Sequence, residues 1–129
     1  MSIKLDMIGI VAEDVDRSLR FYKALGLDVP ESANGEPYIE ITLDGGIRLS
    51  WNALSMVKEI DPEWEEPKGQ RIGLAYLCGS PDEVNQRYDV LVGAGYPGHK
   101  APWDAFWGQR YAQVIDPDGN VVDLFAPLT

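Results

Sequence analysis

Apolar and polar positions along the chain follow an order that occurs twice. In the first copy, the apolar run over residues 3–11 predicts a strand. Four apolar residues then recur at the spacing of one helix face: Val15, Leu19, Tyr22 and Leu25. Asp14 is placed to cap this helix and Gly26 to end it. Extended segments are predicted next, at residues 27–29, 38–43 and 47–51. The first copy is therefore a βαβββ module.

The second copy begins with a predicted strand over residues 71–78. Ser80-Pro81-Asp82-Glu83 is a capping box with proline at the first helical position, so a helix starts here. Its apolar face consists of Val84, Tyr88, Leu91 and Val92. An extended piece over 96–100 is followed by predicted strands at 111–115 and 121–126. Between these two strands, Pro117 fixes φ and Gly119 can take a positive φ, which predicts a tight turn.

Residues 53–69 separate the two copies and show no sustained periodicity. This acidic segment predicts a linker, with a short helical turn over 53–60. We predict one α+β domain over residues 1–129, with module one at 1–52, the linker at 53–69 and module two at 70–129.

The composition excludes several functional classes. With 11 basic and 21 acidic side chains the net charge is −10, which argues against nucleic acid and anionic membranes as partners. One cysteine, Cys78, cannot form an internal disulfide, and no run is apolar enough to span a membrane. The N-terminus lacks a signal-peptide layout, so we expect a cytoplasmic protein. The charge itself indicates either a self-repelling soluble surface or attraction of a cationic ligand.

Two stretches resemble a known family: Ile8–Gly26 and Trp107–Pro127, the latter with the turn DPDGN. They are similar to the vicinal oxygen chelate superfamily, which includes glyoxalase I, the extradiol dioxygenases and the bleomycin resistance proteins. The resemblance implies tandem βαβββ modules that curl into U-shaped half-barrels, with a ligand cleft between modules. It also implies a homodimer.

The metal enzymes of that family place ligands on the first and last strands of each module. By resemblance the matching positions here are Met7, Arg48, Arg71 and Asp123. Of these only Asp123 is a suitable ligand, because a guanidinium stays protonated and a thioether suits hard divalent ions poorly. We therefore predict no metal and no cofactor.

The set of Arg48, Arg71 and Asp123 has two interpretations. Asp123 could pair with one or both arginines and fill the space of a metal. Alternatively, an unpaired arginine could bind a carboxylate, phosphate or enolate-like oxygen of a ligand.

An aromatic stretch follows, with Trp103, Phe106, Trp107 and Tyr111 within nine residues and Gln109 among them. These rings could form a hydrophobic cap, or a stacking wall for a flat ligand with the Gln109 amide as a polar partner. Trp51 of the first module could supply an opposite wall.

We expect a glyoxalase/bleomycin-resistance-like protein that binds an aromatic or extended small organic molecule, in a sequestration or carrier role. No catalytic residue is assigned. The alternative is a metal-dependent lyase, isomerase or dioxygenase with an unusual ligand set, such as Asp123 with His99 or Glu40; a third is an interaction module with a closed cleft. The residues expected to bind ligand are Met7, Arg48, Trp51, Arg71, Trp103, Phe106, Trp107, Gln109, Tyr111 and Asp123.

Overall fold

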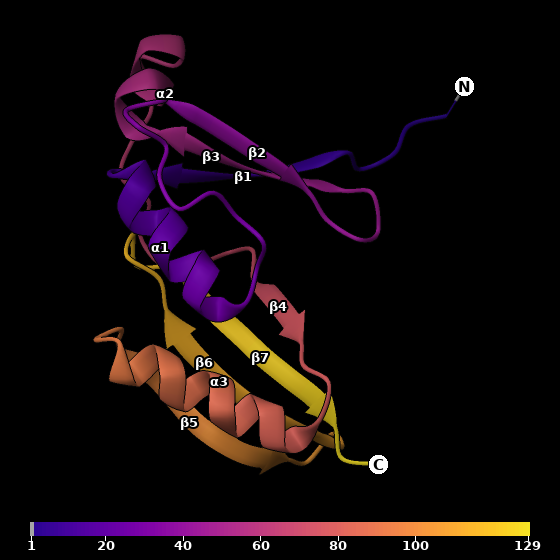
Figure 1. Cartoon of the computed structure of the whole chain (residues 1–129). Helices are drawn as coiled ribbons and strands as arrows, with labels where there is room; N and C mark the ends of the chain where they lie inside the picture. The colour runs from indigo at the N-terminus through magenta and orange to yellow at the C-terminus, as the bar shows by residue number, and fades with distance from the viewer. Residues whose placement is uncertain (1) are drawn as a thin grey trace. The chain divides into compact units, whose positions relative to one another are not determined.

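A computed structural model describes residues 2–129 (Figure 1). The fold is α+β, with three helices and two mixed sheets. The chain forms two compact units. The first comprises the chain up to Lys23 together with Leu27–Glu66, and the second comprises Ala24–Gly26 and Pro67–Thr129.

The first unit contains a three-stranded sheet. In chain order its elements are β1 (Met7–Ala12), α1 (Val15–Leu25), β2 (Tyr38–Thr42), β3 (Arg48–Ala53) and α2 (Leu54–Ile60). The strand order is β1-β3-β2, with β1 parallel and β2 antiparallel to β3. The short helix α2 lies where the sequence predicts a helical turn in the linker.

One face of this sheet packs against α1. Leu49 and Trp51 of β3 are buried, and the Trp51 ring meets Tyr22 of α1 edge-on, with centroids 5.6 Å apart. Asp14 caps α1 as predicted, because its Oδ1 accepts a hydrogen bond from the Arg17 N–H at 3.1 Å. The predicted alternation of β2 is also confirmed, since Tyr38, Glu40 and Thr42 share register rows with the polar residues of β3.

The extended piece expected at residues 27–29 does not join the sheet, so the first unit has three paired strands instead of four. Val29 is nevertheless buried. Pro30 and Pro37 bound the following loop and have no N–H to donate to a strand ladder. Asn34 and Gly35 both have positive φ, at 49° and 80°, so the chain turns between these prolines.

The second unit contains the complete βαβββ pattern. In chain order its elements are β4 (Leu74–Leu77), α3 (Pro81–Gly93), β5 (Gly98–Ala105), β6 (Gln109–Ile115) and β7 (Val121–Pro127). The strand order is β4-β7-β6-β5, with β4 parallel to β7 and the other pairs antiparallel. Helix α3 covers one face of β5, β6 and β7 (Figure 1).

Local signals in the second unit form as predicted. Ser80 caps α3, with its side chain accepting from the Glu83 N–H and with Pro81 at the start of the helix. In the turn between β6 and β7, Gly119 takes a φ of +88°. Asp116, which is 2% exposed, anchors this turn by accepting from the backbone N–H groups of Asp118 and Asn120.

The first strand of the second unit is shorter than predicted. β4 begins at Leu74, so Arg71 and Ile72 precede the paired segment and are exposed. Within residues 2–129, no helix combines the length and apolar character needed to cross a membrane.

Candidate functional site

Each sheet has one face packed by a helix and one face turned away from it. We call the face of the first sheet turned away from α1 the polar face; it is built by Met7, Tyr38, Glu40, Arg48, Ser50 and Asn52. We call the face of the second sheet turned away from α3 the aromatic face. It is built by Ala75, Leu77, Lys100, Trp103, Tyr111, Gln113, Asp123 and Phe125, with Phe106 and Trp107 in the adjoining β5–β6 turn.

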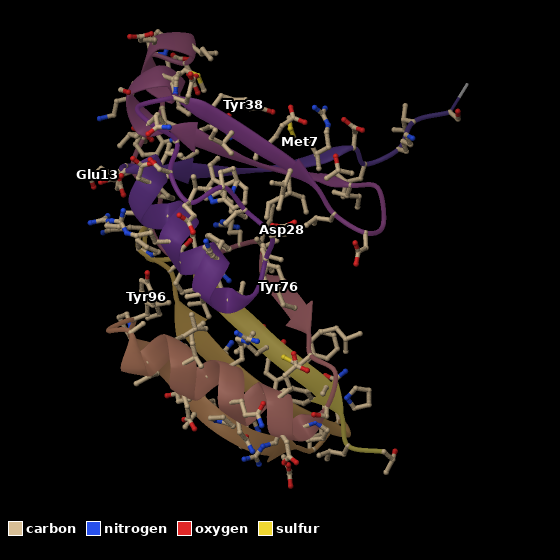
Figure 2. All side chains as sticks on the ribbon, viewed as in Figure 1. Met7, Glu13, Asp28, Tyr38, Tyr76 and Tyr96 are labelled. Atoms are coloured by element: carbon tan, nitrogen blue, oxygen red, sulfur yellow. The ribbon has the colours of Figure 1, made fainter. Side chains whose placement is uncertain are left out.

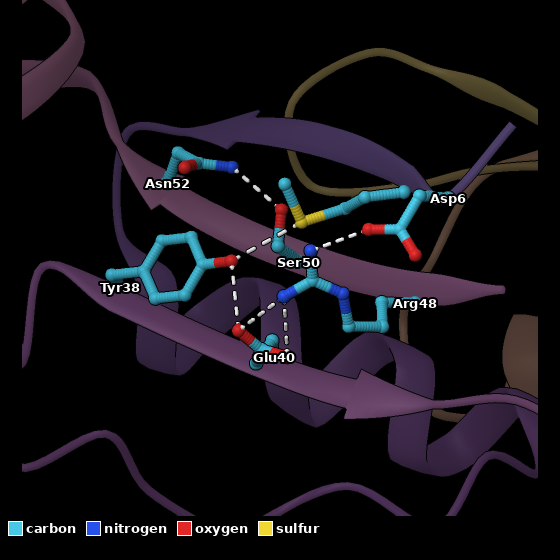
Figure 3. Close-up of polar contacts among 7 residues, drawn as sticks. Asp6, Tyr38, Glu40, Arg48, Ser50 and Asn52 are labelled. Atoms are coloured by element: carbon cyan, nitrogen blue, oxygen red, sulfur yellow. Dashed lines mark hydrogen bonds and ion pairs between the residues drawn. The ribbon is translucent and has the colours of Figure 1, made fainter. Parts of the chain in front are cut away.

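On the polar face, Arg48 lies between two carboxylates (Figure 3). Its Nη2 is 2.6 Å from Oδ2 of Asp6, and its Nη1 is 3.0 Å from each carboxylate oxygen of Glu40. These hydrogen bonds raise the pKa of Arg48, and the bond to Asp6 has the largest effect. The cluster contains one guanidinium and two carboxylates, so its net charge is −1. The idea that Arg48 is free to bind an anionic ligand group is therefore not supported.

The rest of the polar face is closed by short polar contacts. The Tyr38 hydroxyl lies 3.1 Å from Oε1 of Glu40 and 3.2 Å from Sδ of Met7 (Figure 3). Figure 2 labels Met7 and Tyr38, which come from the two outer strands of this sheet. Asn52 donates to Oγ of Ser50 at 3.1 Å. Most hydrogen-bonding groups of this face are thus used within the face itself.

The aromatic face has two register rows that run across all four strands. The first row contains Ala75, Asp123, Gln113 and Lys100. The second contains Leu77, Phe125, Tyr111 and Trp103. Paired residues of adjacent strands project on the same side of a sheet. A polar row with one carboxylate therefore runs beside an aromatic row.

The aromatic rings contact one another continuously. Trp107 meets Trp103, Tyr111 and Phe106 edge-on, with centroid distances of 6.0, 5.3 and 5.1 Å. Tyr111 in turn stacks on Phe125 at 6.2 Å. Trp107 is 49% exposed and Phe106 is 97% exposed. The predicted grouping of the aromatic residues is confirmed, and Phe125 extends it.

These aromatic residues come from two strands and from the turn between them. Trp103 is on β5 and Tyr111 on β6, and only Phe106 and Trp107 lie in the turn. The Gln109 side chain has a partner within the protein, since its Oε1 accepts a hydrogen bond from the Trp107 indole N–H at 2.7 Å. This hydrogen bond holds the Gln109 side chain and the Trp107 ring together.

Asp123 is held by uncharged donors. The Tyr111 hydroxyl donates to its Oδ2 at 2.5 Å, and the Gln113 amide donates to its Oδ1 at 3.0 Å. Burial, together with the bond to Asp123, raises the pKa of Tyr111 to about 12. None of the ion pairs among the described residues includes Asp123. Of the two interpretations, the pairing of Asp123 with an arginine is therefore not supported, because among the described residues its carboxylate has only neutral hydrogen-bond partners.

Trp51 was expected to be a ligand wall and is a core residue instead. It is 0% exposed and lies on the sheet face that packs against α1. Burial of so large a ring contributes to stability and leaves no surface for a ligand.

Lys100 is a component of the aromatic face that the sequence analysis did not identify. Its Nζ lies 4.1 Å from the centroid of the Trp103 ring, within the range of a cation–π contact. Lys100 precedes Trp103 by three residues, and the strand register shifts between them. This irregularity places both side chains on one face, which simple alternation does not predict.

Comparison with known proteins identifies the family. A family model described as "Glyoxalase/Bleomycin resistance protein/Dioxygenase superfamily" matches residues 4–124. The chain belongs to this superfamily. The predicted resemblance to the vicinal oxygen chelate group is thereby confirmed, as is the fold class that it implied.

Similar proteins extend over nearly the whole chain. The uncharacterized protein YraH of Bacillus subtilis (strain 168) is 26% identical over 129 residues, covering 98% of this chain and all of that protein. A glyoxalase/bleomycin resistance protein/dioxygenase family enzyme from Burkholderia phytofirmans superposes with a TM-score of 0.83 at 22% identity, covering 98% of this chain and 100% of that one. A glyoxalase-related enzyme from Fulvimarina pelagi gives a TM-score of 0.80 at 21% identity, covering 95% and 87%. At identities this low, the superpositions establish the shared fold alone.

In this superfamily member, the positions expected to hold a metal do not provide a ligand set. Met7 pairs with Arg48 across β1 and β3, so these two positions are adjacent. In the second unit, however, the residue paired with Asp123 is Ala75, and Arg71 lies before β4. The assignment of Arg71 to this position is therefore wrong. A thioether, a guanidinium, a methyl group and one carboxylate do not fit a divalent metal. Residues 2–129 contain no cluster of three or more His, Cys, Asp or Glu placed to hold one.

A separate hollow of about 490 Å³ lies at the start of α1 in the first unit. Its lining includes the carboxylates of Glu13, Asp14, Asp16 and Glu36. Asp14 caps the helix, and Asp16 accepts hydrogen bonds from the Ala33 N–H and the Ser32 hydroxyl. These two acidic groups therefore hold the local loop structure.

Proposed function

We propose that this protein binds a small aromatic or extended organic molecule at the aromatic face, without a metal, in a sequestration or carrier role. The observation that carries the proposal is the ring cluster centred on the half-exposed Trp107, next to the hydrogen-bonded carboxylate of Asp123. The superfamily often binds small ligands, which supports a binding role for this face.

The exposure of large apolar side chains favours ligand contact over simple packing. Phe106, Trp107 and Leu77 are 97%, 49% and 68% exposed. Neighbouring exposed apolar groups are usual at binding sites, because they keep apolar area in water until a ligand covers it. Flat rings that already have fixed neighbours lose little conformational entropy when they stack on a ligand.

The donor set supports a metal-independent mode of binding. Asp123 already accepts two hydrogen bonds, and its register partner Ala75 has no ligating atom. We therefore assign the polar row to ligand orientation. The homodimer implied by the resemblance remains a prediction. Light scattering after size-exclusion chromatography tests it by measuring the mass of the particle in solution.

Isothermal titration calorimetry tests this function with three probes of similar shape: N-methylquinolinium, quinoline and naphthalene-2-sulfonate. We expect saturable binding of at least one probe, unchanged by prior treatment with EDTA. Trp107→Leu should weaken that binding about tenfold, since it removes the central ring of the cluster. Trp64→Leu, at a partly exposed tryptophan of the first unit, should leave it unchanged.

Three results would contradict the proposal. These are no saturable binding of any probe, loss of binding after EDTA, and equal weakening by the Trp107 and Trp64 substitutions. Circular dichroism of each variant confirms that it is folded before its affinity is compared.

A further inference from the structure

We propose that the aromatic face is selective for organic cations, and that in the free protein the ammonium of Lys100 occupies the ligand cation's position over Trp103. This inference rests on the proposed function, because it names the ligand class of the same face. It also assigns a role to Lys100, that of an internal competitor that a ligand must displace.

Lys100 already makes a cation–π contact on the aromatic face. Its Nζ lies 4.1 Å from the Trp103 ring centroid, so this ring face accepts a cation in the absence of ligand. A positive charge is attracted to the negative face of an indole, and the attraction grows when water is excluded. Trp107 and Tyr111 meet Trp103 edge-on at 6.0 and 5.5 Å, so the ring is held in place by its neighbours.

The charges of the two register rows also favour a ligand cation. Among their eight residues, Asp123 is the one anion and Lys100 the one cation. They are not joined by any of the ion pairs among the described residues. Tyr111 and Gln113 hold Asp123 by hydrogen bonds without neutralising it. A ligand cation on this face therefore meets an uncancelled carboxylate, and a ligand anion is repelled by it.

The spacing between Lys100 and Asp123 fits a small flat cation. Lys100 and Asp123 are in the same row, separated by Gln113, so their strands are two intervals apart. Strands are about 4.8 Å apart, which places the two positions about 10 Å from each other. A flat cation of one or two rings can stack on Trp103 while its charge remains within the field of Asp123. Lys100 is exposed and has a flexible stem, so its ammonium can move into water when a ligand binds.

The molecule provides a matched control for Lys100. In the first unit, Lys58 lies over the ring of Trp64, with Nζ 5.8 Å from the centroid. Replacing either lysine by methionine removes one positive charge from a chain of net charge −10, so both variants have the same net charge. Only the change at Lys100 vacates a position on the aromatic face.

Titration calorimetry with the same three probes tests the inference. We expect N-methylquinolinium to bind about tenfold more tightly than quinoline, and naphthalene-2-sulfonate to bind most weakly. Lys100→Met should raise the affinity for N-methylquinolinium about threefold or more and change that for quinoline less. Lys58→Met should leave both affinities near the wild-type values. Lys100→Arg keeps a cation over Trp103 and should not raise the affinity for N-methylquinolinium.

The possible outcomes separate this inference from the proposed function. Equal binding of all three probes, weakened by Trp107→Leu, would overturn cation selectivity and leave the proposed function standing, as would a preference for the anion. A fall in N-methylquinolinium affinity in Lys100→Met would overturn the role of Lys100 as a competitor. An equal rise in Lys58→Met and Lys100→Met would do the same. Absence of binding by any probe would overturn the proposed function itself.

Discussion

The polar face and the aromatic face lie at corresponding places in the two modules but treat charge in opposite ways. On the polar face, Arg48 of β3 is surrounded by the carboxylates of Asp6 and Glu40. On the aromatic face, Asp123 of β7 is held by a hydroxyl and an amide. Both residues pair with the first strand of their module, Arg48 with Met7 and Asp123 with Ala75.

The difference shows that position in a repeated fold does not determine chemistry. Arg48 has its charge cancelled by close partners, so the polar face has little left to offer an anion. Asp123 is satisfied as a hydrogen-bond acceptor while its charge persists, because neutral donors stabilise a carboxylate without compensating it. One fold can therefore contain a closed polar network and a charged binding face in successive modules.

The largest expected effect on stability is at Trp51, the buried tryptophan of the first module, and it is compared with the half-exposed Trp107 of the second. Trp51→Ala should lower the free energy of unfolding by roughly 3–5 kcal/mol, because a fully buried ring leaves a cavity. Trp107→Ala, at a half-exposed ring, should cost about 1 kcal/mol or less. Urea denaturation measures both. Equal losses would show that Trp107 is a core residue and not part of a binding face.

The next effect concerns Asp123. Asp123→Ala leaves the Tyr111 hydroxyl and the Gln113 amide without their acceptor in a partly buried setting. Loss of a shared acceptor of this kind costs about 1–3 kcal/mol. We expect a loss in this range by chemical denaturation, with the fold retained by circular dichroism. A stability equal to that of the wild type would mean that these bonds are not formed in solution.

A pH dependence should follow from Tyr111, whose pKa is raised to about 12 by burial and by Asp123. In the unfolded chain the pKa of a tyrosine is about 10. Between these two pKa values the unfolded state loses its proton first, so the free energy of unfolding falls as the pH rises. Below the pKa of the unfolded chain this contribution to stability is fully present. Burial and the charge of Asp116 raise the pKa of Tyr76 to about 12, so this residue adds to the same fall of stability with pH.

Denaturation midpoints across this alkaline range test that prediction. Tyr111→Phe should reduce the slope and leave the part that comes from Tyr76. An unchanged slope in this variant would contradict the shift assigned to Tyr111.

The smallest effect is expected on the polar face. Arg48→Met removes ion pairs whose side chains are 34%, 55% and 37% exposed for Arg48, Asp6 and Glu40. Exposed pairs of this kind contribute about 0–1 kcal/mol, and salt screens them. Thermal denaturation at low and high salt should show a small loss that fades as salt is added. A loss larger than that of Asp123→Ala would reverse the comparison between the two faces.

The sequence predicts the parts of the fold that depend on short-range signals. The capping groups Asp14 and Ser80 and the turn glycine Gly119 act within a few residues, so both long helices and the β6–β7 hairpin were predicted correctly. The burial of Trp51 could also have been predicted from the sequence. Leu49 and Trp51 alternate with Arg48 and Ser50, which places Trp51 on the apolar side of its strand.

Strand register and cross-strand partners could not be predicted in the same way. The run Arg71–Cys78 has no strict alternation, so nothing local decides that Ala75, and not Arg71, pairs with Asp123. The partners of Asp123 come from β6, and their contact depends on the β6–β7 register. The fourth strand expected in the first module depended on pairing that residues 27–29 do not make.

The most direct test of the account follows the four tryptophan indole N–H signals by NMR while N-methylquinolinium is added. We expect the signals of Trp103 and Trp107 to shift along a saturable curve. Those of Trp51, which is buried in the first unit, and Trp64 should stay in place. Saturable shifts confined to Trp64 or Trp51, or no shift at Trp103 and Trp107, would contradict the assignment of the binding site to the aromatic face.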